Sequence, residues 1–176
     1  FKIINPIYLY SVKIFFYFFS RNLNLKIKLV NDFNQIPKKH ITHHDIELNK
    51  SQDYLNWRFK SNPHEYKIFM IEDNDKYVGY FVFREAKYKV QPSLFLADIN
   101  LNKNYLKLTK KIFSKLIISY FDMNRFVFIA SCVSKKSNYW KYLSICLPFR
   151  YSSIPFIIFE DLAPKDFIQI RDKTIQ

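Results

Sequence analysis

The chain has 176 residues and a mass of 21.5 kDa, a length that fits one domain. Hydrophobic residues make up 49% of it and aromatic residues 19%, which excludes intrinsic disorder. Its single glycine, Gly79, excludes a phosphate-binding loop built on several glycines. The two cysteines cannot form a disulfide framework, which favours a reducing compartment, and we expect a cytoplasmic protein.

The charge of the chain is strongly positive. Lys and Arg number 28 against 15 Asp and Glu, so the formal net charge is +13. Most of the basic residues are lysines, and the chain is also rich in Asn, Ile, Phe and Tyr, all of which have A/T-rich codons. No recognised nucleic-acid-binding motif accompanies the charge, so we expect no specific nucleic-acid partner.

The N-terminal segment predicts a helix. Asn5 and Pro6 are typical of a helix start, and residues 7–20 are apolar on almost every side, with Lys13 as the only charge. A helix that is apolar all round is buried. We therefore expect residues 1–22 to form an inter-domain or N-terminal helix that packs on a preceding domain. Peripheral contact with a membrane interface is the alternative. The apolar run is too short to span a bilayer.

The next third of the chain alternates short elements. A polar stretch, residues 31–50, predicts a loop with one short helical turn. Ser51 is a plausible N-cap for the helix that follows. The expected elements are a strand over Leu23–Val30, a helix over Gln52–Phe59, an antiparallel hairpin of Tyr66–Ile71 and Tyr77–Arg84, and a strand over Ser93–Ile99.

The remainder predicts a crossover and a final strand and helix. Residues 103–120 carry apolar side chains at helical spacing, with lysines on the other face. The expected elements are a helix over Lys103–Tyr120, a buried strand over Arg125–Ala130, a helix over Lys136–Cys146, a strand over Ile154–Glu160 and a short helix over Pro164–Ile170. The order indicates a mixed α/β fold: a hairpin, then a strand-helix-strand crossover.

This order resembles the GNAT superfamily of N-acetyltransferases, which have a central mixed sheet with such a hairpin and crossover. One local word sharpens the resemblance: Asp53-Tyr54-Leu55-Asn56-Trp57-Arg58-Phe59, followed by Pro63, Tyr66 and Gly79-Tyr80. It is similar to a subgroup whose members often contain two such domains in tandem, and this chain would match the second. The resemblance covers about residues 23–160. It implies a GNAT-like domain over 23–162, with a C-terminal short helix and tail over 163–176.

The resemblance also implies a place for the acyl donor, acetyl-CoA. In the superfamily its pyrophosphate lies on backbone N–H groups of a glycine-containing loop after the fourth strand, where a helix N-terminus attracts an anion. The corresponding stretch here has no glycine and consists of Asn102, Lys103, Asn104 and Tyr105. The two asparagines tolerate positive φ, and Lys103 or Lys107 would add charge. The alternative is an ordinary turn.

Two further residues are candidates for the chemistry. Asp98 ends a strand where mixed sheets place ligands, and it is either a general base or amine binder, or a turn carboxylate. The family's Gly-Phe motif corresponds to Pro148-Phe149, and the tyrosine that acts as general acid before it falls on Ser144. Tyr142 and Tyr139 are nearby, and we take Tyr142 as the candidate acid.

The leading hypothesis is therefore an acyl-CoA-dependent N-acyltransferase, an N-acetyltransferase acting on a small amine such as an amino sugar or a cell-envelope precursor. The main alternative is a catalytically degenerate GNAT-like domain that binds or scaffolds. A third is an anionic-surface binder that uses the lysines of residues 103–115.

Other conspicuous residues have structural interpretations. His40, His43 and His44 with Asp45 resemble metal ligands, but nothing in this polar loop would orient them, so we expect no metal site. Trp57 is expected to anchor the core, and Arg58 to donate to loop carbonyls. Cys132 and Cys146 are expected to be inert packing residues.

Overall fold

The computed structural model describes residues 6–37, 50–88, 91–126, 128–131 and 138–143. Its helices are α1 (Pro6–Ser20), η1 (Phe33–Gln35), α2 (Gln52–Phe59), η2 (Lys103–Leu108), α3 (Thr109–Tyr120), η3 (Met123–Arg125) and α4 (Trp140–Leu143), where η marks a 3₁₀ helix. Its strands are β1 (Lys26–Val30), β2 (Tyr66–Asp73), β3 (Lys76–Tyr88), β4 (Gln91–Leu101) and β5 (Phe128–Ser131).

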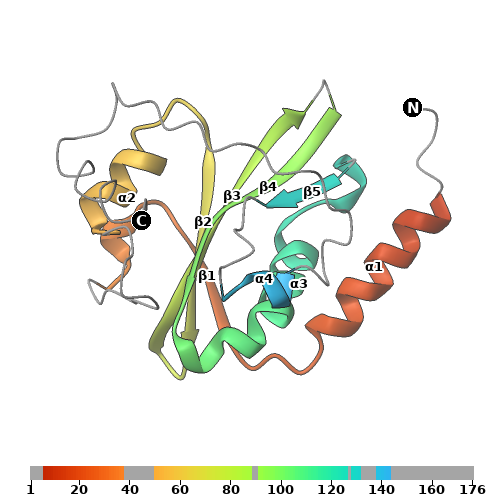
Figure 1. The fold of residues 1–176 in the computed structure, drawn as a ribbon, viewed down its shortest axis with the longest axis horizontal. Coiled ribbons are helices and arrows are strands. Elements are labelled where there is room, and N and C mark those ends of the chain that lie inside the picture. The colour runs from red at the N-terminus through yellow and green to blue at the C-terminus, as the bar shows by residue number, and fades with distance from the viewer. Residues whose placement is uncertain (1–5, 38–49, 89–90, 127, 132–137, 144–176) are drawn as a thin grey trace, which may run out of the picture.

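The five strands form one sheet in the order β1-β2-β3-β4-β5. The first four are antiparallel to their neighbours, and β5 runs parallel to β4. Figure 1 shows α2 on one side of this sheet and α1 and α3 on the other. The predicted mixed α/β class, with an antiparallel hairpin, a strand-helix-strand crossover and flanking helices, is confirmed.

The β2–β3 hairpin is tighter than the sequence indicated. Its turn consists of Asn74 and Asp75, which have φ angles of 48° and 60°. Two central residues with positive φ match the right-handed twist of the paired strands, and Asn and Asp tolerate that backbone conformation. The strands therefore extend to Asp73 and from Lys76, beyond the predicted hairpin strands.

Each face of the sheet has its own core. The face under α1 and α3 carries the larger cluster, whose fully buried side chains include Phe69, Phe81, Phe83, Leu101 and Phe113. The face under α2 carries a smaller one, formed by Val30, Phe33, Ile36, Leu55, Phe59, Ile68, Met70, Tyr80 and Val82. Because both faces are covered, β2 and β3 are apolar on consecutive residues rather than alternating.

The only glycine is required by the close approach of β3 to β4. A Cβ on Gly79 would lie 2.1 Å from the carbonyl oxygen of Asn100 and 2.7 Å from the Cα of Leu101. Both distances are far below van der Waals contact, and the backbone there has a φ of +157°. Gly79 thus lets the end of β4 pair closely with β3.

Helix α1 packs against α3 of the same chain. Phe16 is 2% exposed, and its ring centroid lies 6.0 Å from that of Phe113. On the opposite face Ile14, Tyr17 and Phe18 are 52%, 63% and 66% exposed. One side of this apolar helix thus belongs to the core, while the other lies at the surface. Contact of the exposed side with a further domain stays a prediction.

The crossover helix begins later than its apolar spacing predicted. Residues 103–108 form the 3₁₀ helix η2, and α3 begins at Thr109. The Tyr105 amide donates to the Asn102 carbonyl three residues back, a 3₁₀ bond, and the Asn102 side chain accepts from the Asn104 amide. Side-chain spacing did not distinguish this tight turn from the first turn of an α-helix.

Several expectations fall outside the described residues. They are the strand over 154–160, the helix over 164–170, the histidine-rich segment and both cysteines. Of the helix expected over 136–146, the described part is α4. Among the described helices, each is too short or too polar to cross a bilayer.

Candidate active site

Among the described strands, the pairing of β4 with its neighbours changes at its middle. A bulge lies where Val82 pairs with Asp98 while the next residue, Phe83, pairs with Leu96. Pairing with β5 runs from Ser93 to Leu96 within the described residues, whereas β4 continues along β3 to Leu101. A bulge bends a strand and redirects its side chains. Within the part of the chain that the structure describes, residues 97–101 have no strand partner on the edge of β4 that faces away from β3.

Asp98 lies directly after this bulge. Its carboxylate is 11% exposed and receives two charged or polar contacts from distant parts of the chain. The Lys50 ammonium lies 2.6 Å from Oδ1, and the Tyr80 hydroxyl donates to Oδ2 at 3.0 Å. The structure thus places the candidate base in a nearly buried polar cluster at the point where the sheet opens.

Two tyrosines of β3 interact with this carboxylate, Tyr80 by a hydrogen bond and Tyr77 electrostatically. Burial, together with the negative charge of Asp98 and the hydrogen bond to it, raises the pKa of Tyr80 well above its usual value. Burial and the neighbouring Tyr139 and Asp98 likewise raise the pKa of Tyr77. Tyr80 therefore stays protonated at neutral pH and serves as a permanent donor to Asp98.

The amides at the β4 edge have side-chain partners. The Ile99 amide donates to Asp98 Oδ1 at 2.9 Å. Two residues further on, the Leu101 amide donates to the Tyr139 hydroxyl at 2.8 Å. Alternate residues of a strand direct their amides to the same edge. The Ile99 and Leu101 amides on this edge are thus both engaged by side-chain oxygens of the chain itself.

The stretch expected to cradle a diphosphate, residues 102–105, uses most of its amides within the chain. The Asn102 amide donates to the Val78 carbonyl, the Asn104 amide to the Asn102 side chain, and the Tyr105 amide to the Asn102 carbonyl. These three amides do not fit a diphosphate cradle in this conformation, because N–H groups must be unpaired to hold an anion.

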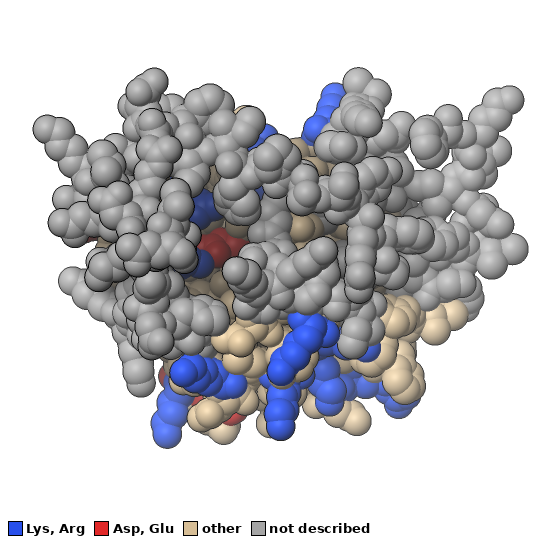
Figure 2. All heavy atoms as spheres, viewed as in Figure 1, with Lys and Arg blue, Asp and Glu red and all other residues tan. Residues whose placement is uncertain are grey.

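The side chains of the same stretch have different roles. The Tyr105 hydroxyl donates to Asp73 Oδ2 at 2.7 Å, which ties η2 to the β2–β3 hairpin and raises the pKa of Tyr105. Lys103 and Lys107 are exposed. Figure 2 shows lysine and arginine gathered at the end of the molecule where Figure 1 places the hairpin and η2. Cations, rather than amides, are what this segment offers to an anion.

Tyr142, the candidate acid, lies on α4. It is half-buried, and the Lys141 ammonium lies 4.9 Å from the centre of its ring. The tyrosine of this segment whose hydroxyl reaches β4 is Tyr139, which is 8% exposed. Spacing from the Pro148-Phe149 motif gave no signal for Tyr139, because the contact with Leu101 depends on how α4 packs on the sheet.

The sequence word on α2 is largely structural. Ser51 caps the helix by accepting from the Tyr54 amide, as predicted. Asn56 accepts from the Phe33 amide at 2.8 Å and donates to Asn34, so it ties α2 to η1. The prediction that Trp57 anchors the core is wrong: its side chain is 56% exposed.

The reason for the Trp57 correction is helical geometry. Leu55 and Phe59, four residues apart, fill the buried face of α2, and Trp57 lies between them on the outer side. Arg58 was expected to donate to loop carbonyls, but it donates to the Tyr54 hydroxyl at 3.2 Å and stacks over the Phe59 ring.

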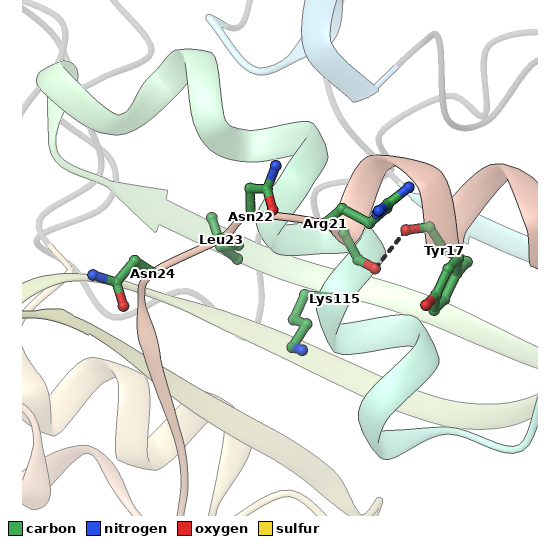
Figure 3. Close-up of a pocket in the computed structure, with 7 residues that line it drawn as sticks. Tyr17, Arg21, Asn22, Leu23, Asn24 and Lys115 are labelled. Atoms are coloured by element: carbon green, nitrogen blue, oxygen red, sulfur yellow. Dashed lines mark hydrogen bonds between the residues drawn. The ribbon is translucent and has the colours of Figure 1, made fainter.

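A separate hollow of about 560 Å³ lies between the end of α1 and α3 (Figure 3). Its lining includes two cations, Arg21 and Lys115, and no acidic residue; the other lining residues are Tyr17, Ser20, Asn22, Leu23 and Asn24. Asp98 is not part of it. Among the described residues no group of three or more histidine, cysteine or acidic side chains could hold a metal ion.

The comparisons with known proteins place the fold. An aminoglycoside acetyltransferase from an uncultured soil metagenomic sample, solved with sisomicin, superposes with a TM-score of 0.53 over 77% of this chain and 95% of its own, at 14% identity. Ribosomal-protein-alanine N-acetyltransferase from Brucella melitensis biovar Abortus 2308 gives 0.53 over 77% and 99%, at 9% identity. No protein-family model and no curated protein sequence matches this chain. The chain has the GNAT N-acetyltransferase fold.

Proposed function

We propose that this domain is an acyl-CoA-dependent N-acyltransferase, with acetyl-CoA as donor and a small amine as acceptor. The observation that carries the proposal is the convergence at the β4 bulge. Asp98 Oδ1 accepts from a primary ammonium, that of Lys50, and from the Ile99 amide. A base that binds an ammonium and a backbone N–H able to polarise a carbonyl are the two groups that amide formation from a thioester needs.

The chain's residues would divide the reaction as follows. Asp98 takes a proton from the bound ammonium, and the neutral amine attacks the thioester carbonyl. The Ile99 amide, released from Asp98, donates to the carbonyl oxygen as negative charge develops there. The new C–N bond replaces the C–S bond, and a tyrosine of α4, with Tyr142 as the candidate, protonates the leaving thiolate.

Donor binding would rest on cations. The amides of Asn102, Asn104 and Tyr105 are engaged, so we assign the diphosphate to the exposed Lys103 and Lys107 side chains. Attraction between exposed charges is screened by salt. Acetyl-CoA affinity should therefore weaken steeply with ionic strength. Replacing both lysines by alanine should weaken it further, whereas Lys60→Ala, on the opposite side of the sheet, should not.

The acceptor class that we propose rests on the chemistry of the site and on the family resemblance of the sequence. An ammonium with hydroxyl groups around it suits a carboxylate flanked by tyrosines, and we propose an amino sugar or a cell-envelope precursor. A cytoplasmic location, expected from the cysteine usage, would supply the acyl-CoA. The wild-type domain with acetyl-CoA and glucosamine as probe should release free thiol.

The decisive measurement is calorimetric titration with acetyl-CoA followed by a thiol-release assay. We expect saturable binding, and turnover that Asp98→Asn lowers at least about a hundredfold, because a general base contributes about that much or more. Asp75→Asn, at an exposed carboxylate on the hairpin, is the matched control and should turn over normally. Absence of heat and of a thermal shift at millimolar acetyl-CoA would overturn the proposal.

A degenerate domain that binds or scaffolds is the second candidate. The observation in its favour is that the amides of Leu101, Asn102, Asn104 and Tyr105 all donate within the chain. It predicts that Asp98→Ala and Asn102→Ala leave cellular function intact, whereas disrupting the exposed face of α1 at Tyr17 and Phe18 abolishes it. The reverse pattern would exclude it.

A further inference from the structure

Lys50 holds the position at Asp98 that an acceptor amine would need. It directly precedes Ser51, the N-cap of α2. Its side chain is 23% exposed, and its ammonium lies 2.6 Å from Asp98 Oδ1, across 48 residues of sequence. A primary amine of the protein itself therefore occupies the candidate base.

The same oxygen of Asp98 also accepts from the Ile99 amide, at 2.9 Å. The Lys50 nitrogen and the β4-edge amide are thus held on one atom. An acyl carbonyl polarised by the Ile99 amide would lie next to the Lys50 nitrogen. Holding the amine and the thioester together in one site would replace a bimolecular encounter with an intramolecular step.

We propose that Lys50 is a self-acylation site of this domain. The inference rests on the proposed function, since the acyl group comes from acyl-CoA. Asp98 accepts a proton from the Lys50 ammonium, and the neutral nitrogen attacks the thioester carbonyl. The C–N bond forms, the C–S bond breaks, and CoA leaves as the thiol with one proton. The products are N-acyl-Lys50 and free CoA, and no oxidant or reductant is needed.

Acylation would change the site electrostatically. An acylated lysine has lost its positive charge and cannot form an ion pair. The Asp98 carboxylate would keep the Tyr80 hydroxyl as a donor and become available to the ammonium of an external amine. Self-acylation would thus convert a site closed by Lys50 into one open to an acceptor.

The chain supplies its own control lysines. Lys67 pairs with Glu85 at 2.7 Å, and Lys28 pairs with Glu72 at 2.7 Å. Their side chains are 35% and 41% exposed, more than the 23% of Lys50, and their carboxylate partners lie on β2 and β3 rather than at the β4 edge. Non-enzymatic acetylation in solution favours the more accessible amines. Faster acetylation of Lys50 than of the two control lysines would therefore show that the site promotes the reaction.

The experiment is site-resolved mass spectrometry of the purified chain incubated with acetyl-CoA. We expect Lys50 to gain one acetyl group about tenfold faster, or more, than Lys67 and Lys28, with a rate constant independent of protein concentration. Asp98→Asn should reduce the rate at Lys50 to that of the control lysines and leave theirs unchanged. The wild-type comparison needs no variant, and melting temperatures show whether Asp98→Asn is folded.

Two results would overturn the inference. Only the second would also overturn the proposed function. If acetyl-CoA binds and an external amine is acetylated while Lys50 reacts no faster than Lys67, self-acylation fails and the proposed function stands. If calorimetry finds no acetyl-CoA binding and the three lysines react alike, both fail. Lys50→Arg keeps a cation on Asp98 but removes the acceptor amine. It should abolish the fast acetylation, and no neighbouring lysine should become acetylated faster in its place.

Discussion

The Tyr139 hydroxyl lies 2.8 Å from the Leu101 amide nitrogen and closes the far end of the open β4 edge. The two residues are 38 positions apart, and both are nearly or fully buried. The hydroxyl therefore occupies a backbone donor that an extended ligand lying along β4 would use. Two opposing effects follow from removing it.

Tyr139→Phe should destabilise the domain and strengthen donor binding. Loss of the hydroxyl leaves the buried Leu101 amide unpaired, which costs about 1–3 kcal/mol in the free energy of unfolding. The same amide becomes available to acetyl-CoA, whose dissociation constant should fall. Chemical denaturation and calorimetry measure the two quantities. Weaker acetyl-CoA binding in a folded Tyr139→Phe variant would show that the hydroxyl contacts the donor instead.

Asn56 and Trp57, which are neighbours on α2, should differ sharply in how much they contribute to stability. Asn56→Ala removes the acceptor of the Phe33 amide, so we expect a loss of about 1–3 kcal/mol in the free energy of unfolding. Trp57→Ala trims a side chain that is 56% exposed and should cost about 1 kcal/mol or less. Urea denaturation of both variants tests this order. A larger loss of stability in Trp57→Ala than in Asn56→Ala would show that Trp57 packs in the core.

Two phenylalanines of α1 test how that helix is packed. Phe16→Ala empties a site in the core beside Phe113 and should cost about 3–5 kcal/mol. Phe18→Ala removes a ring that is 66% exposed and should change stability by less than about 0.5 kcal/mol. Equal, small losses in denaturation experiments would mean that α1 does not pack on α3.

Gly79→Ala should disturb the end of β4. The added Cβ would meet the Asn100 carbonyl and the Leu101 backbone, so the strands must separate, at a cost of about 1–3 kcal/mol. Hydrogen exchange should accelerate at the Asn102 amide, which donates to Val78. Ala86→Gly, at the other end of β3, is the control. It should cost about 1 kcal/mol and leave that amide protected.

Stability should fall at alkaline pH in a way that depends on Tyr80. Burial and Asp98 raise the pKa of Tyr80 in the folded chain above the unfolded value of 10.0. The unfolded chain therefore loses this proton first, and the free energy of unfolding decreases as pH rises above about 10, by up to about 1.4 kcal/mol per pH unit. Tyr80→Phe should reduce that slope, with Tyr17→Phe, at an exposed hydroxyl, as the control. An unchanged slope in Tyr80→Phe would contradict the assignment.

Local signals in the sequence determined most of the elements. The Ser51 cap, the polar residues of the hairpin turn and the period-two or helical spacing of apolar residues act over a few positions, so they predicted α1, α2 and the strands. The element order predicted the mixed α/β class, and the residue pattern of 93–99 placed Asp98 on the strand where the structure has it.

Only the tertiary structure decided the site itself. The contacts of Asp98 with Lys50 and of Leu101 with Tyr139 join residues 48 and 38 positions apart, and such pairs leave no periodic signal in a single sequence. The same holds for the exposure of Trp57 and for the side of α1 that reaches Phe113, since each depends on what packs alongside. Spacing determines which residues share a face, whereas packing determines what that face meets.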